Sequence, residues 1–104
     1  MRKEDLPDYL QKAFVIFVSE FSGHLQCFDS IVASPEKLAS EAIEVSRRFH
    51  TIKGGAGFLQ LETVAQLAGE GEALFKQEPM PEEAISKLEE LARSLRAEYD
   101  QLEK

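Results

Sequence analysis

Apolar residues recur at steps of three and four along almost the whole chain, and this spacing constrains the fold more than any other feature. The repeat is cleanest near the C-terminus, where the apolar positions are Ala84, Ile85, Leu88, Leu91, Leu95, Tyr99 and Leu102. Such spacing places apolar side chains on one face of an α-helix. No stretch alternates between apolar and polar residues over the length of a strand. We therefore predict an all-α fold.

Three short breaks divide the chain into four helical segments. They are Ser34-Pro35-Glu36, where serine is a preferred N-cap and proline suits the first helical position, the glycine-rich stretch 54–57, and the pair of prolines in Glu78-Pro79-Met80-Pro81. We predict helices over residues 7–33, 35–57, 61–77 and 81–102, in a single domain covering residues 1–104. Connections this short favour an antiparallel up-down-up-down four-helix bundle. The alternative is a coiled coil between chains, which the many small residues of the third segment disfavour.

Charge and composition limit the partners that the chain can have. The 104 residues carry twelve Lys and Arg against nineteen Asp and Glu, a formal charge of −7. This balance repels nucleic acid and anionic membrane surfaces, so we expect neither as a partner. The single cysteine excludes an intramolecular disulfide, and the first residues lack the pattern of a signal peptide. We expect a cytoplasmic monomer.

The second segment contains a stretch, residues 45–57, with features that a helical bundle alone does not need. Its apolar repeat runs through Phe49 and Ile52, which places His50 beside the core but pointing away from it. Lys53 follows one turn later, and Gly54, Gly55 and Gly57 remove side chains from the same stretch. One interpretation is that the glycines simply end the helix. The other is that they clear the surface so that a macromolecule can approach the imidazole.

Local charge favours the second interpretation. No acidic residue occurs between Val45 and Leu61, and Arg47, Arg48 and Lys53 gather there with His50. An acidic pocket or a phosphoryl group would be attracted to this region of an otherwise anionic chain. A neutral imidazole can attack phosphorus to form a labile phosphoramidate, and Lys53 could neutralise the phosphoryl oxygens.

Residues 49–59, FHTIKGGAGFL, resemble the signature of histidine-containing phosphotransfer (HPt) domains, and most closely the variant at the N-terminus of chemotaxis-type histidine kinases. The resemblance implies that His50 is the phosphoacceptor, on its outer ring nitrogen, and that Lys53 contacts the phosphoryl group. It also implies that Glu72 hydrogen-bonds the inner nitrogen and sets the tautomer. Gly69 stands where that branch often has a second histidine, which places an extended hydrogen-bond network in question.

We expect the surface that docks partners to include Ser46, Arg47, Gly54 and Gly57. The resemblance implies two kinds of partner, the receiver domain of a response regulator and the catalytic domain of a histidine kinase, in cis or in trans. Four helices fill the chain and leave no room for an ATP site, so we predict a phosphohistidine carrier rather than an enzyme. No cofactor is expected, and no metal, because His24 and Cys27 are only two ligands. The competing hypothesis is a helical interaction or dimerisation module without chemistry.

Overall fold

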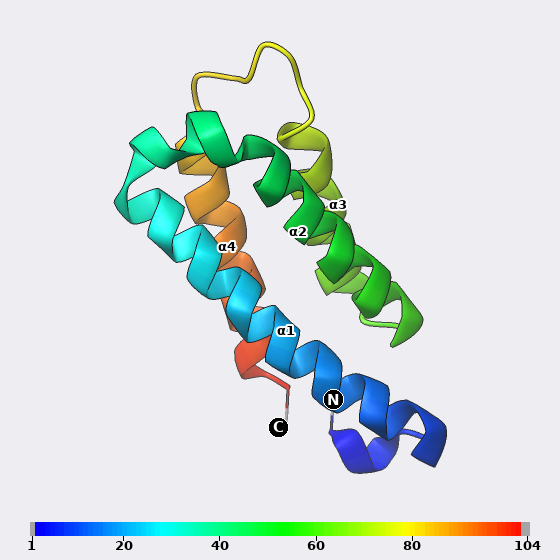
Figure 1. Ribbon diagram of the computed structural model, residues 1–104. Coiled ribbons are helices and arrows are strands. Elements are labelled where there is room, and N and C mark those ends of the chain that lie inside the picture. Colours follow the sequence, from blue (N-terminus) through cyan, green and yellow to red (C-terminus); the bar gives the residue numbers. More distant parts are fainter. Residues whose placement is uncertain (1, 103–104) are drawn as a thin grey trace.

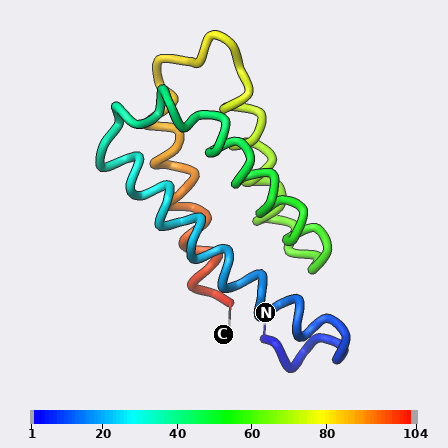
Figure 2. The backbone as a smooth tube through the Cα atoms, viewed as in Figure 1, coloured from blue at the N-terminus to red at the C-terminus, as the bar shows by residue number. Residues whose placement is uncertain are grey.

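The structure, a computed structural model, describes residues 2–102. It contains four α-helices, α1 (Asp8–Ala33), α2 (Leu38–Phe58), α3 (Glu62–Leu74) and α4 (Ala84–Asp100), with short 3-10 helices at Lys3–Asp5 and Pro35–Lys37 (Figure 1). Successive helices run in opposite directions, and the traced backbone goes up, down, up and down through the bundle (Figure 2). No strand occurs in this part of the chain. The predicted all-α bundle is confirmed.

The helix ends differ from the prediction mainly around the two prolines. The third helix ends at Leu74 rather than at residue 77, and the fourth begins at Ala84 rather than at residue 81. Residues preceding proline disfavour the helical conformation, so the loop before α4 takes more of the chain than predicted. Similarly, Pro35–Lys37 forms a 3-10 turn before α2 begins at Leu38. Of the described residues, no helix is long and apolar enough to cross a lipid bilayer.

Phenylalanine rings form the centre of the core. Phe49 of α2 lies between Phe28 of α1 and Phe75 at the end of α3, with ring centroids 4.4 Å and 6.0 Å away and nearly parallel planes. All three rings are buried. Aromatic side chains of this size supply a large share of the apolar area that stabilises a small bundle. The residue next to Phe49 is His50, so the stack holds this part of α2 in place.

Two glycines allow helices to approach closely. A Cβ atom at Gly71 would lie 2.5 Å from Cδ1 of Phe49, and one at Gly55 would lie 2.6 Å from Cδ1 of Phe17. Both distances are far below van der Waals contact, so each glycine is needed where a ring lies against the helix backbone. At Gly71 this contact brings α3 directly against α2. For Gly55 the expectation of a cleared surface is wrong, because the position serves packing.

Helix α2 continues through its glycines and ends beyond them. Gln60 has φ of 61°, the left-handed conformation that usually selects glycine. The Leu61 amide donates to the carbonyl of Ala56 at 2.8 Å, and the Gln60 amide donates to that of Gly57 at 3.1 Å, which together form a Schellman motif. The interpretation that the glycines end the helix is therefore wrong. Gly54, Gly55 and Gly57 all lie inside it.

Candidate functional site

His50 lies in the C-terminal half of α2 with its ring in solvent. Its side chain is 67 % exposed, whereas the neighbouring Phe49 is fully buried. The predicted geometry, an imidazole held beside the core but pointing away from it, is confirmed. A reactive group from another protein can reach the ring from outside.

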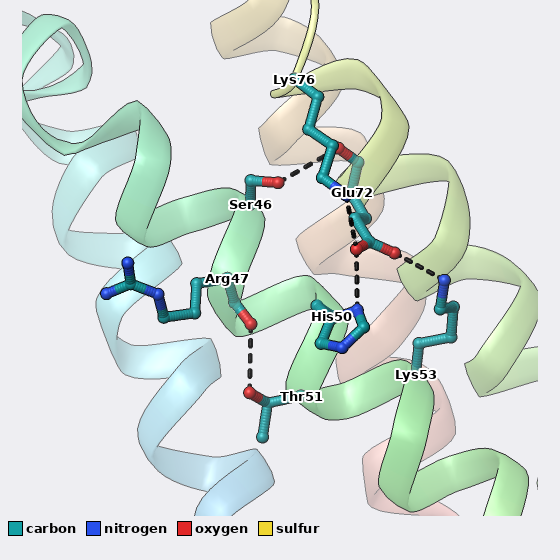
Figure 3. Close-up of polar contacts among 7 residues, drawn as sticks. All are labelled: Ser46, Arg47, His50, Thr51, Lys53, Glu72 and Lys76. Atoms are coloured by element: carbon teal, nitrogen blue, oxygen red, sulfur yellow. Dashed lines mark hydrogen bonds and ion pairs between the residues drawn. The ribbon is translucent and has the colours of Figure 1, made fainter.

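The inner nitrogen of the ring is bonded to a carboxylate from the next helix. His50 Nδ1 lies 2.8 Å from Oε2 of Glu72, whose side chain is only 8 % exposed (Figure 3). An ionised carboxylate can only accept, so Nδ1 must carry the proton of this bond. In the neutral ring the outer nitrogen, Nε2, then has a free lone pair. The structure thus brings together the two residues that the sequence paired.

Two lysines bind the same carboxylate. Lys53 Nζ lies 2.6 Å from Oε1 of Glu72, and Lys76 Nζ lies 3.0 Å from Oε2. Glu72 lies between the two ammonium groups in the close-up (Figure 3). Lys53 was expected near His50, and here its partner is Glu72. Lys76 was missed from the sequence, although a glutamate four residues before a lysine is a recognisable helical pair.

These contacts keep Glu72 ionised although it is nearly buried. The hydrogen bonds from Lys53 and then Lys76 lower the pKa of the Glu72 carboxyl from 4.5 to about 2, with a smaller contribution from His50 and against the opposing effect of burial. The carboxylate is therefore an anion at any physiological pH. A permanent anion beside Nδ1 favours the tautomer that has its proton on that nitrogen.

The expected docking residues have different environments. Ser46 is only 6 % exposed, and its hydroxyl donates to the backbone carbonyl of Glu72 at 3.3 Å. The expectation that it belongs to an exposed docking surface is wrong, because it is an inward position that ties α2 to α3. Arg47 is exposed and pairs with Glu44 at 3.3 Å. At Gly54 and Gly57 a Cβ would meet no atom within 4 Å, so this part of the surface is open.

A cavity of about 600 Å³ lies beside His50, between α2 and the start of the loop that follows α3. Its wall is mainly apolar but includes several charged side chains. The residues that form it are Ala42, Ile43, Ser46, Arg47, His50, Glu72, Phe75, Lys76, Gln77, Glu78 and Met80. The sequence did not predict this cavity. The segment after α3 supplies five of its residues, Phe75, Lys76, Gln77, Glu78 and Met80. The spacing of apolar residues along the helices does not predict how such a loop folds back against α2.

His24, the other histidine, lies away from this site. Its Nδ1 accepts a hydrogen bond from Nη1 of Arg48 at 3.0 Å, and its Nε2 is buried without a partner. Burial, and then the Arg48 charge, lower the pKa of His24 below its ordinary value. Within residues 2–102 no three potential metal ligands lie together.

Comparison with known families identifies the class of this chain. It matches the Hpt domain over residues 4–104, and it therefore belongs to the Hpt domain family. Searches among curated proteins and among solved structures gave no significant match. Hpt domains are phosphocarrier modules without an ATP site of their own, and they interact with receiver domains and kinases in phosphorelay signalling. A phosphotransfer role follows for this chain.

Proposed function

We propose that Nε2 of His50 carries the phosphoryl group and exchanges it with the aspartate of a receiver domain. The observation that supports this most strongly is the bond between Nδ1 and Glu72 on a ring whose other side is open to solvent. It combines an accessible nucleophile with a fixed tautomer. The same glutamate is the feature that favours the chemotaxis-kinase branch, in which a kinase catalytic domain is the donor, in cis or in trans.

The transfer balances without any proton leaving the ring. The Nε2 lone pair of neutral His50 attacks the phosphorus of an aspartyl phosphate, the Nε2–P bond forms, and the bond to the aspartate oxygen breaks. The receiver recovers its carboxylate. The ring keeps its proton on Nδ1 and becomes a phosphoimidazolium, whose positive charge is next to the Glu72 carboxylate. The reverse reaction follows the same steps, so one site can both accept and donate the group.

The surface around the ring is suited to an acidic partner. Lys53 lies on the same helix one turn beyond His50, and its side chain is 44 % exposed, so its ammonium group can reach phosphoryl oxygens. The open backbone at Gly54 and Gly57 lets a receiver come close, and Arg47 adds positive charge. We assign Arg47, Gly54 and Gly57 to the docking surface. We also propose that the protein acts as a monomer in the cytoplasm.

Phosphorylation with phosphoramidate, a small donor that needs no docking, tests the chemistry. We expect one added phosphate per chain, labile in acid and stable in base, and its loss in His50→Gln. His24→Gln is the matched control and should be labelled normally. Circular dichroism should show equal helicity in all three proteins. Labelling that persists in His50→Gln would contradict the proposal.

Incubation with a phosphorylated receiver then separates the two hypotheses of function. A carrier gains the mass of one phosphate on His50 while the receiver loses it. A purely helical interaction module would bind the receiver without gaining any phosphate.

A further inference from the structure

Glu72 is supported by two cations through different oxygens. Lys53 binds Oε1, while Lys76 binds Oε2, the same oxygen that accepts the proton of His50 Nδ1. A carboxylate has enough lone pairs for all three donors at once. The two supports are therefore independent, and the loss of the contact at Oε1 leaves both contacts at Oε2 in place.

Phosphorylation of His50 would offer a new anionic partner to only one of these lysines, Lys53. A phosphoryl group on Nε2 brings a charge close to −2 and three strong acceptor oxygens to the exposed side of the ring. Lys53 is three residues from His50 on the same helix, and its long flexible stem lets the ammonium group change partners. Lys76 lies in the turn that follows α3, and it binds Oε2 of Glu72, the oxygen that also contacts Nδ1 (Figure 3).

We propose that Lys76 is a positioning residue that holds Glu72 on Nδ1 when Lys53 turns from Glu72 to the phosphoryl group. This inference rests on the proposed function of His50. Before phosphorylation both lysines contact Glu72. After phosphorylation each lysine contacts a different group. Lys53 then neutralises the phosphoryl oxygens, while Lys76 keeps the carboxylate ionised and in place beneath the positively charged ring.

The position of Lys76 suits a lasting support. It follows α3, which ends at Leu74, and a cation there interacts favourably with the carbonyl end of the helix. It lies four residues after Glu72, the better order for such a pair. It also provides the third contact to the carboxylate in a chain that has Gly69 where a second histidine would be expected. A Cβ at Gly69 would lie 3.5 Å from Cδ of Lys53, so a larger side chain would meet the stem that must move.

The proton on Nδ1 of His50 is the probe that tests this proposal. Its exchange with water, followed by NMR with 15N-labelled histidine, reports how firmly Glu72 holds it. Before phosphorylation we expect normal protection in Lys53→Gln and in Lys76→Gln, because each retains one lysine. The double variant should exchange on the order of threefold faster, the scale of an exposed ion pair. Unchanged exchange in the double variant would overturn the proposal.

After phosphorylation with phosphoramidate the expectation for Lys76→Gln changes. Its Nδ1 proton should now exchange about threefold faster than that of the phosphorylated wild type. Lys76→Arg should restore protection, and Lys87→Gln, a lysine of α4, should have no effect. Loss of protection that is equal before and after phosphorylation would make Lys76 a static support and refute the exchange of partners.

Two other outcomes are also decisive. If phosphorylated Lys76→Gln behaves as wild type, Lys53 bridges Glu72 and the phosphoryl group by itself, and the proposal is wrong. If wild-type His50 takes no phosphate at all, the proposed function itself fails. The comparison of unphosphorylated variants would still report whether the two lysines support Glu72 jointly, so the two failures are distinguishable.

Discussion

Replacing a glycine by alanine should have opposite effects on stability at different positions of this chain, and Gly71→Ala is the most informative of these substitutions. An added Cβ would lie 2.5 Å from both Cδ1 and Cε1 of Phe49. Carbon atoms in contact are normally about 3.5–4.0 Å apart, so the ring or the helix must move by about 1 Å. Phe49 cannot yield easily, because it is stacked between Phe28 and Phe75.

The expected loss follows from two opposing effects. Overpacking of a filled core costs about 1–3 kcal/mol, and alanine regains about 0.5–1 kcal/mol over glycine inside a helix. Gly71→Ala should therefore lower the free energy of unfolding by about 1 kcal/mol, within a range of about 0–2.5 kcal/mol. Gly54→Ala is the matched control, since its Cβ meets nothing within 4 Å. It should raise the free energy of unfolding by about 0.5–1 kcal/mol.

Urea unfolding followed by circular dichroism measures both variants on one scale. The slopes of the two transitions should agree with the wild type, so that midpoints report stability alone. Displacement of α3 should also weaken the bond between Glu72 and His50, and faster exchange of the Nδ1 proton would report this. A Gly71→Ala protein as stable as Gly54→Ala would refute the claim that close packing requires the glycine.

Three further predictions concern docking, the end of α2 and acid stability. Gly54→Gln should slow transfer from a receiver by at least about tenfold, the cost of poor complementarity at a contact, while labelling by phosphoramidate stays normal; equal slowing of both reactions would contradict a docking role. Gln60→Gly should raise the free energy of unfolding by about 1 kcal/mol, because glycine has no Cβ and adopts the φ of 61° without steric cost. An unchanged urea midpoint would contradict this. The lowered pKa of His24 means that the unfolded chain binds more protons below its ordinary value of 6.5, so stability should fall as the pH drops below about 6.5. Arg48, Glu20 and Glu44 are the charged groups that act on this ring. Because glutamine does not titrate, His24→Gln should flatten the dependence of stability on pH in this range. An unaltered dependence would show that another group is responsible.

The helices and the exposure of His50 could be predicted because both follow from local periodicity. A stripe of apolar residues on α2 leaves only one orientation for the helix, and the position of His50 relative to Phe49 then places its ring in solvent. The same periodicity misplaced Ser46, which lies at the edge of the stripe and becomes buried only because α3 covers it. The distinction between edge and interior depends on the neighbouring helix, and no local pattern contains it.

The end of α2 shows a related limit. Glycine permits a helix to stop, and the three glycines at 54, 55 and 57 invited that interpretation. The helix instead passes through them and ends at Phe58, and Gln60, two residues later, takes a conformation that glycine would adopt more easily. The tertiary structure decides here, because Gly55 and Ala56 must remain helical to face the core. Local preference is a weak prior when such packing opposes it.

Four of the six glycines, Gly54, Gly55, Gly57 and Gly71, separate into two groups once their neighbours are known, and the separation connects the core to the proposed function. Gly55 and Gly71 are required by rings that lie against them, and the contact at Gly71 brings α3 close enough for Glu72 to reach His50. Gly54 and Gly57 have no such neighbour, yet each weakens the helix by about 0.5–1 kcal/mol relative to alanine. Among residues 2–102 no side chain packs closely enough against either position to require a glycine there. Because both positions lie within two turns of the exposed His50 ring, this cost supports the proposal that a partner approaches the backbone of α2 at that point.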